Sequence, residues 1–414
     1  MMKTNIHSKF PCLLALVIGA AVSACGGSSN KSTTVTTPVI PTNPSSPDSN
    51  ELGISAVPNS LSTTYTAALN FDRYTSYDAP NGKSIHILAQ NEVSSNQIVR
   101  ARNILTHYLT NLPGSQYGSD KSEVANKMAN NGAVLLLLNG VDDGTNAAAQ
   151  LDGQPLYYGE MQVEGSDWYI NQNYDHRDAS FEEILHLVHD YGIGVDQNEK
   201  FVGVLPEFQA DIRAAQTTAV NSKLWAWSQD FANWLQELSA ENSLTQEYLA
   251  SVIDSYYGLW GAYTGEYGMW GGYIAKTRSD IIDKDPEGAS LMDNKFFHSY
   301  LTYNARIDES FSGDFSLRLD QSKPYTYHAQ YLKDVTLTGD KDSNIIVNAM
   351  DNFLTGNSGN NTVIFSGDSS EYSITLSSNQ VVVEDLQDNR DGKNTIAGVE
   401  ILKFKDTSIE TTSL

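Results

Sequence analysis

The sequence predicts an α+β protein in which a mixed domain of strands and helices is followed by a small all-β roll. Strand and helix patterns alternate between residues 84 and 189, and helical patterns run from 205 to 282. After residue 311 the chain becomes a series of short strands broken by Gly, Asn and Asp. We therefore expect residues 51–310 to form the mixed domain and residues 311–414 to form the β-rich tail.

The chain begins with a pattern typical of an export signal. Two lysines precede an apolar run at Leu13–Val22, and small residues lead into Cys25. The segment resembles the lipobox of bacterial lipoproteins, which implies that residues 1–25 are a signal peptide and that Cys25 is lipidated. Gly26 after the cysteine favours the outer membrane or cell surface in that family. The apolar run is too short to span a bilayer comfortably as a permanent helix. The alternative to the lipobox is an ordinary cleaved signal with a chance cysteine.

Residues 26–50 consist almost wholly of Ser, Thr, Pro, Asn and Gly, which predicts a disordered tether. Cys12 and Cys25 are the two cysteines, so the mature protein would have no internal disulfide. The formal net charge of −24 argues against nucleic acid as a partner, because binding phosphates requires clustered Lys and Arg. An acidic excess suits an exported surface, and it suits calcium equally well.

The mixed domain is expected to contain strands and helices in a definite order. An amphipathic helix follows the first strand, and Pro206 suits the first turn of a later helix. The expected elements are a strand at 84–90, helices at 96–110 and 121–130, a strand at 133–138 and an edge strand at 155–163. An aromatic- and glycine-rich segment at 256–270 indicates either tight helix packing or a platform that stacks on sugars.

The strongest indication of function is the segment Ser180–His189. On a helix, Glu182, His186 and His189 share one narrow stripe opposite an apolar face. Imidazole and carboxylate are ligands that zinc prefers, which makes a zinc-bearing helix the leading hypothesis. The alternative is a pair of surface or hydrogen-bonded histidines. Glu183 also has a structural explanation, since Ser180 and Glu183 have the spacing of a helix capping box.

A second acidic pair, Glu207 and Asp211, lies four residues apart on the next predicted helix. Together with the histidine helix it resembles the gluzincin metallopeptidases of the zincin fold, whose motif H-E-x-x-H is completed by a later glutamate. The resemblance implies Glu183 as general base, His186 and Glu207 as zinc ligands, and Asp211 as a carboxylate that orients a ligand. Because Glu182 replaces the first histidine, we expect His186, His189 and Glu207 as ligands, with Glu182 in reserve.

The tail contains a repeat. Segments beginning at Asn344, Asn352 and Asn361 recur at intervals of eight and nine residues, which predicts a parallel β-roll. Residues 354–365 resemble the calcium-binding repeats of RTX proteins, and residues 398–406 resemble the strand that closes such rolls. The resemblance implies weak calcium binding, since asparagines replace ligating aspartates. The implied residues are Asp351, Asn352, Gly356, Gly359 and Asn361. A metal-free structural cap is the alternative.

These observations predict a zinc-dependent peptidase that is lipid-anchored at the cell surface and acts on a peptide or protein substrate. Two other functions fit the same residues. One is a non-catalytic adhesin that binds glycan through the aromatic segment and a calcium-tuned roll. The other is a zincin pseudoenzyme that keeps the fold without its metal.

Overall fold

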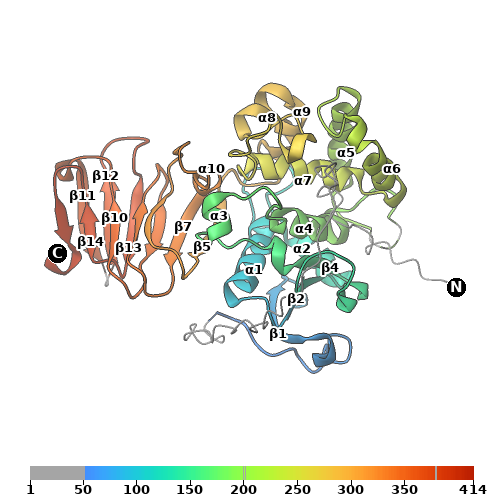
Figure 1. Ribbon diagram of the computed structural model, residues 1–414, viewed down its shortest axis with the longest axis horizontal. Coiled ribbons are helices and arrows are strands. Elements are labelled where there is room, and N and C mark those ends of the chain that lie inside the picture. The colour runs from blue at the N-terminus through green and yellow to red at the C-terminus, as the bar shows by residue number, and fades with distance from the viewer. Residues whose placement is uncertain (1–51, 199, 201, 378–379) are drawn as a thin grey trace, which may run out of the picture.

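The computed structural model describes residues 52–198, 200, 202–377 and 380–414. The predicted signal peptide, Cys25 and the tether lie outside the described residues. The predicted α+β class is confirmed: a sheet with helices comes first, a helical region follows, and the C-terminal part consists of β-sheets (Figure 1). Within the described part of the chain, no helix combines the length and the apolar character needed to cross a bilayer.

The first sheet has four strands in the order β1-β2-β3-β4. Their bounds are Phe71–Asp78, Ser84–Gln90, Val134–Leu138 and Gln154–Tyr157. β1 is antiparallel to β2, whereas β2, β3 and β4 run parallel. β4 is an edge strand, as expected, but it is shorter than predicted because the chain turns into a 3₁₀ helix at Tyr158–Glu160.

Both faces of this sheet are covered, which explains the continuous apolar run of β3. Alternate residues such as Leu135 and Leu137 join the main core with helices α1 (Ser95–Leu109), α2 (Ser122–Asn130) and α4 (Ser180–Val188). The opposite residues, including Leu136, pack into a smaller cluster beneath the N-terminal loop. A short helix, α3 (Asp167–Asn171), precedes α4.

The helical region is built around α7 (Leu244–Tyr256), which is buried on nearly all sides. Around it lie α5 (Pro206–Asn221), α6 (Ala232–Glu241), α8 (Arg278–Lys284) and α9 (Pro286–Met292). Pro206 occupies the first turn of α5, as predicted. In Figure 1, α4 lies in the centre of the molecule, between β4 and α7.

The C-terminal strands form two sheets, of orders β15-β14-β10-β8-β6 and β11-β12-β13-β9-β7-β5. From β6 to β10 successive strands alternate between the sheets, and neighbouring strands within each sheet are parallel in this part. This alternation is the arrangement expected of a parallel roll. The strand bounds are β5 Leu301–Ile307, β6 Gly313–Ser316, β7 Leu332–Leu337, β8 Ser343–Ile346, β9 Asn352–Thr355, β10 Asn361–Ile364, β11 Tyr372–Ser377, β12 Gln380–Asp385, β13 Lys393–Ala397, β14 Ile401–Lys403 and β15 Ser408–Glu410, with α10 (Thr326–Ala329) between β6 and β7.

The asparagines of the repeat serve the backbone of the roll. Asn352 and Asn361 are buried, and their Nδ2 groups donate to the carbonyls of Lys333 and Ser343, one strand further along the sheet. The Oδ1 atom of Asn361 accepts a hydrogen bond from the backbone amide of Asn357, whereas the buried Oδ1 atom of Asn352 has no hydrogen-bond partner among the described residues. Calcium binding by these two asparagines stays a prediction.

The other residues implied in calcium binding, Asp351, Gly356 and Gly359, also have structural roles in the roll. Asp351 accepts a hydrogen bond from the backbone amide of Lys393. A side chain at Gly356 or Gly359 would collide with a neighbouring backbone carbonyl, so both glycines allow close approach of the chain. Among the described residues of the tail, no three acidic or histidine side chains come close enough to bind one ion. Calcium binding in the tail stays a prediction.

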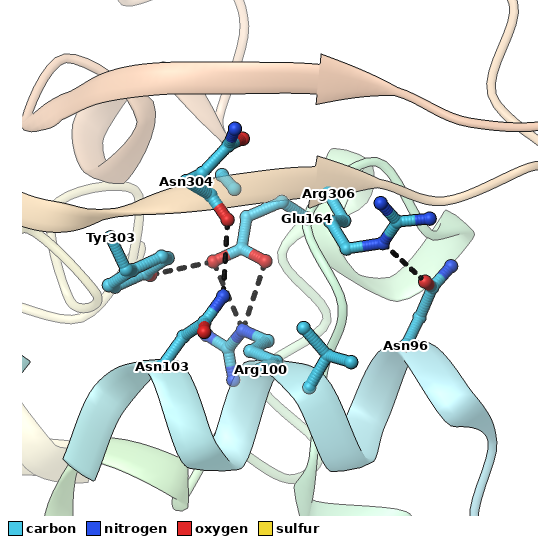
Figure 2. Close-up of a pocket in the computed structure, with 9 residues that line it drawn as sticks. Asn96, Arg100, Asn103, Glu164, Tyr303, Asn304 and Arg306 are labelled. Carbon is cyan, nitrogen blue, oxygen red and sulfur yellow. Dashed lines mark hydrogen bonds and ion pairs between the residues drawn. The ribbon is translucent and has the colours of Figure 1, made fainter. Parts of the chain in front are cut away.

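The roll is joined to the first domain by a buried ionic network (Figure 2). Arg100 of α1 donates to Glu164 at 3.0 Å and to Asp178 at 2.6 Å, and all three side chains are buried. Tyr303 of β5 donates to Glu164 at 2.8 Å. Because Tyr303 belongs to the tail sheet, this network ties together segments that are far apart in the sequence.

Candidate metal centre

The first turn of α4 brings its acidic residues to the site. Asp178 accepts a hydrogen bond from the backbone amide of Ser180, where the helix begins. The capping box expected from Ser180 and Glu183 is not formed, because Ala179 is the N-cap residue and makes no side-chain cap. Glu183 is therefore not explained by helix capping.

Three side chains from two helices converge at the centre of the molecule. Glu182 and His186 lie one turn apart on α4, and Glu247 lies in the first turn of α7. One ligand atom from each residue lies within 4.8 Å of the other two, and this is the one such group among the described residues. The Nε2 atom of His186 is 3.7 Å from Oε1 of Glu247.

The environment of these three residues fits a divalent cation. The side chains of Glu182, His186 and Glu247 are only 6%, 12% and 11% exposed. The buried Nε2 atom of His186 has no hydrogen-bond partner among the described residues, so it can bind a metal once the ring has lost its proton. Two carboxylates and an imidazole are oxygen and nitrogen donors that zinc accepts, although this donor set alone does not identify the ion.

Glu183 lies on the other side of the His186 ring. Its Oε2 atom is 3.6 Å from Nδ1 of His186 and accepts a hydrogen bond of 2.6 Å from Gln154. Gln154 is the first residue of the edge strand β4. The chain Gln154–Glu183–His186 thus links the sheet edge to a ligand, and neither contact uses Oε1 of Glu183.

Glu160 adds a second carboxyl group to this side of the site. Burial, together with the nearby charge of Glu183, raises the pKa of Glu160 to about 8. A carboxyl group with that pKa is mostly protonated at neutral pH. Glu160 and Glu183 therefore lie close enough to influence each other's charge.

His189, one of the predicted ligands, is not part of this group. It is fully buried at the start of a π-helical turn, His189–Ile193, and its Nε2 atom is 2.6 Å from Oε1 of Gln209 on α5. Three residues along a helix rotate the side chain by about 60° from His186, and this rotation turns His189 toward α5 instead of α7. Burial lowers the pKa of His189 to about 4, so the ring is neutral at pH 7.

Glu207 and Asp211 are also not part of the group. Glu207 is exposed on the first turn of α5, and Asp211 accepts hydrogen bonds from Tyr117 and Lys295. The reason is the orientation of α5, whose buried face is formed by other residues, including Phe208. The structure therefore does not bring His186, His189 and Glu207 together, and the group that it does bring together contains His186, the reserve residue Glu182 and Glu247.

Sequence reasoning missed Glu247, Arg177 and Asp254. Arg177 forms ion pairs with Glu182 and with Asp254 of α7. A signal for the two acidic residues was present, because Glu247 and Asp254 lie seven positions apart in a segment that is otherwise largely apolar. Two acids on one face of a helix that is buried all round require a nearby cation or proton.

The aromatic segment predicted at 256–270 packs mainly within the protein. Trp260 is 1% exposed, and its ring lies 4.9–5.4 Å from the rings of Tyr174, Tyr263 and Trp270. This clustering fits the helix-packing alternative, since a ring buried between others cannot stack on a sugar.

Metal uptake is expected to release about one proton per protein at pH 7. Burial disfavours the charged form of His186, but Glu247, Glu183 and Asp190 outweigh burial and raise its pKa to about 9. A metal binds the neutral imidazole, so apparent affinity should fall about tenfold for each pH unit below 9. Titration calorimetry in buffers of different ionisation enthalpy measures the proton count, and a count of zero would contradict the prediction.

The same pKa has the opposite consequence for stability of the metal-free protein. Because the pKa of His186 in the folded state lies above its ordinary value of 6.5, its contribution to stability is complete below pH 6.5 and is lost as pH rises through 9. Metal-free and metal-loaded protein should therefore respond differently to alkaline pH.

No protein-family model matches this chain, and the search of curated proteins finds no match. The resemblance to gluzincins and to RTX repeats consequently rests on the motif residues alone. The structure establishes an α+β chain with a buried Glu–His–Glu group that could hold a metal ion, and no family is identified.

Proposed function

We propose that this protein is a zinc-dependent peptidase whose metal is held by Glu182, His186 and Glu247. The observation that carries the proposal is the buried convergence of these three side chains within 4.8 Å. Catalytic zinc sites use three protein ligands and leave one position for water, whereas structural sites are closed by four. The group of three described here fits the first pattern.

Glu183 is the proposed general base. A divalent cation in the site would polarise a water molecule and lower its pKa. Glu183 is adjacent to the ligands, is about one quarter exposed, and has Oε1 free of the contacts that hold Oε2. It can therefore accept a proton from that water through Oε1 while Oε2 keeps His186 in place.

A peptide is the proposed substrate because of the position of β4. This strand pairs with β3 on one side only, and its residue Gln154 contacts Glu183. An extended peptide added to the free edge of β4 would run beside the proposed base. The predicted export and lipid anchor at Cys25 would place this activity at the cell surface, where it would act on extracellular peptides.

Replacing Glu183 with glutamine tests the proposal. Zinc should be retained, because the ligands remain, whereas hydrolysis of an unstructured protein such as casein should fall about 10²–10⁴-fold. Glu207→Gln is the matched control and should leave hydrolysis unchanged, since Glu207 is exposed on α5. A wild-type protein that binds zinc without hydrolysing any peptide would support the pseudoenzyme instead.

A further inference from the structure

Arg177 lies next to the proposed ligands and is shared by two carboxylates. Its guanidinium forms an ion pair with the ligand Glu182 and donates to Asp254 at 2.8 Å. Glu182 and Asp254 are 6% and 1% exposed, so both pairs lie in a region with little water. In such surroundings charges interact more strongly than at a surface.

The geometry of the two helices sets these charges in a row. Glu247 and Asp254 are two turns apart on one face of α7. His186, near the end of α4, lies beside Glu247 at the start of α7. Arg177, which precedes α4, pairs with Asp254 near the end of α7. The two helices therefore run in opposite directions. The charged side chains between the two helices thus follow one another in the order Arg177, Glu182 and His186 along α4, with Asp254 facing Arg177 and Glu247 facing His186.

We propose that Arg177 is an internal competitor of the metal for Glu182. This inference rests on the proposed metal site. When the cation binds, Glu182 leaves the guanidinium, and Asp254 holds Arg177 in place. Arg177 thus lowers the affinity of the site and lets it exchange metal, while Asp254 offsets that effect.

Two electrostatic effects act in the same direction. An arginine paired with Glu182 must give up that pair before the carboxylate can ligate a metal. The remaining positive charge also repels a dication a few ångströms away, and in a poorly solvated site this repulsion is worth about tenfold or more in affinity. Removing Arg177 eliminates both effects. Removing the charge of Asp254 leaves Glu182 as the one carboxylate paired with Arg177 among the described residues, and this strengthens the competition.

The test measures zinc affinity of the full chain by competition with a chromophoric chelator. Arg177→Met should bind zinc about tenfold more tightly, and Asp254→Asn should bind it more weakly. The double variant should bind as tightly as Arg177→Met, because Asp254 acts through Arg177. Arg177→Lys, which keeps the charge, should return toward wild-type affinity. Arg213→Met is the matched control, since Arg213 pairs with Asp196 and should leave affinity unchanged.

The outcomes are separable. If Arg177 only supports the fold, Arg177→Met and Asp254→Asn should both weaken binding and their effects should accumulate in the double variant, which would overturn the inference. Unchanged affinity in Arg177→Met would overturn it as well. If Arg177→Met does not fold, Arg177→Gln takes its place in the same comparison. Wild-type protein that binds no zinc would instead defeat the proposed metal site.

Discussion

Glu247→Gln is expected to lower zinc affinity about 100-fold or more. Glutamine keeps the size of the side chain but removes the negative charge that faces Nε2 of His186 at 3.7 Å. A neutral amide is a poor zinc ligand, and the two ligands that remain come from a single helix. The loss should therefore exceed what is seen when a residue outside the coordination sphere is changed.

Glu207→Gln provides the comparison, because Glu207 is the glutamate that sequence spacing alone favours. It lies exposed on α5, and its replacement should leave zinc binding at the wild-type level. Equilibrium dialysis with metal analysis at pH 7.5 measures both variants, and circular dichroism checks their folding. Equal affinity of Glu247→Gln and wild type would show that α7 does not supply a ligand.

Arg100→Met is expected to lower the free energy of unfolding by about 3–5 kcal/mol. Burial by itself would lower the pKa of Arg100, but Asp178 and Glu164 raise it, so the guanidinium stays charged between them. Without it, two buried carboxylates face each other and Tyr303 with no cation. Removing one partner of a buried ion pair is costly because the other charge is left unpaired.

Arg306→Met is the matched control. Arg306 and Arg100 line one small pocket, in which Arg306 donates to Asn96 at 3.2 Å (Figure 2). Arg306 is only partly buried and forms no ion pair with a described acidic residue. Its loss should cost about 1 kcal/mol or less. Urea unfolding measures both variants, provided that the m-value stays constant. Similar midpoints for the two variants would refute the role given to the Arg100 network.

Much of the fold is readable because local patterns determine it. The strand predicted at 84–90 matches β2, and the apolar run of β3 identified a central strand. β1 was not predicted, because its apolar residues Phe71, Tyr74 and Tyr77 recur every three positions instead of alternating with polar ones. The repeat spacing after residue 344 predicted a parallel β-roll, and the structure has strands β6 to β10 alternating between two sheets.

Only part of the Glu182–His186–Glu247 group could be predicted from the sequence, and the reason is physical. Glu182 and His186 are one helical turn apart, so their convergence follows from local geometry. Glu247 comes 61 residues after His186, and α5 and α6 intervene. Which helix packs against α4 depends on the whole core, and the spacing of one motif contains no information about it. The short separation to Glu207 therefore favoured α5, whereas the third member of the group in the structure comes from α7.

The packing of α4 against α7 also bears on how the protein would respond to metal supply. A cation bound between Glu182 and Glu247 would act as a cross-link that closes a long loop of chain, in a protein for which no disulfide is expected. A ligand at 1,000 times its dissociation constant adds about 4 kcal/mol to the free energy of unfolding. Removing the metal with a chelator would therefore destabilise the packing of α4 against α7 as well as abolish catalysis. Resistance to proteolysis would then report how much zinc the surroundings provide.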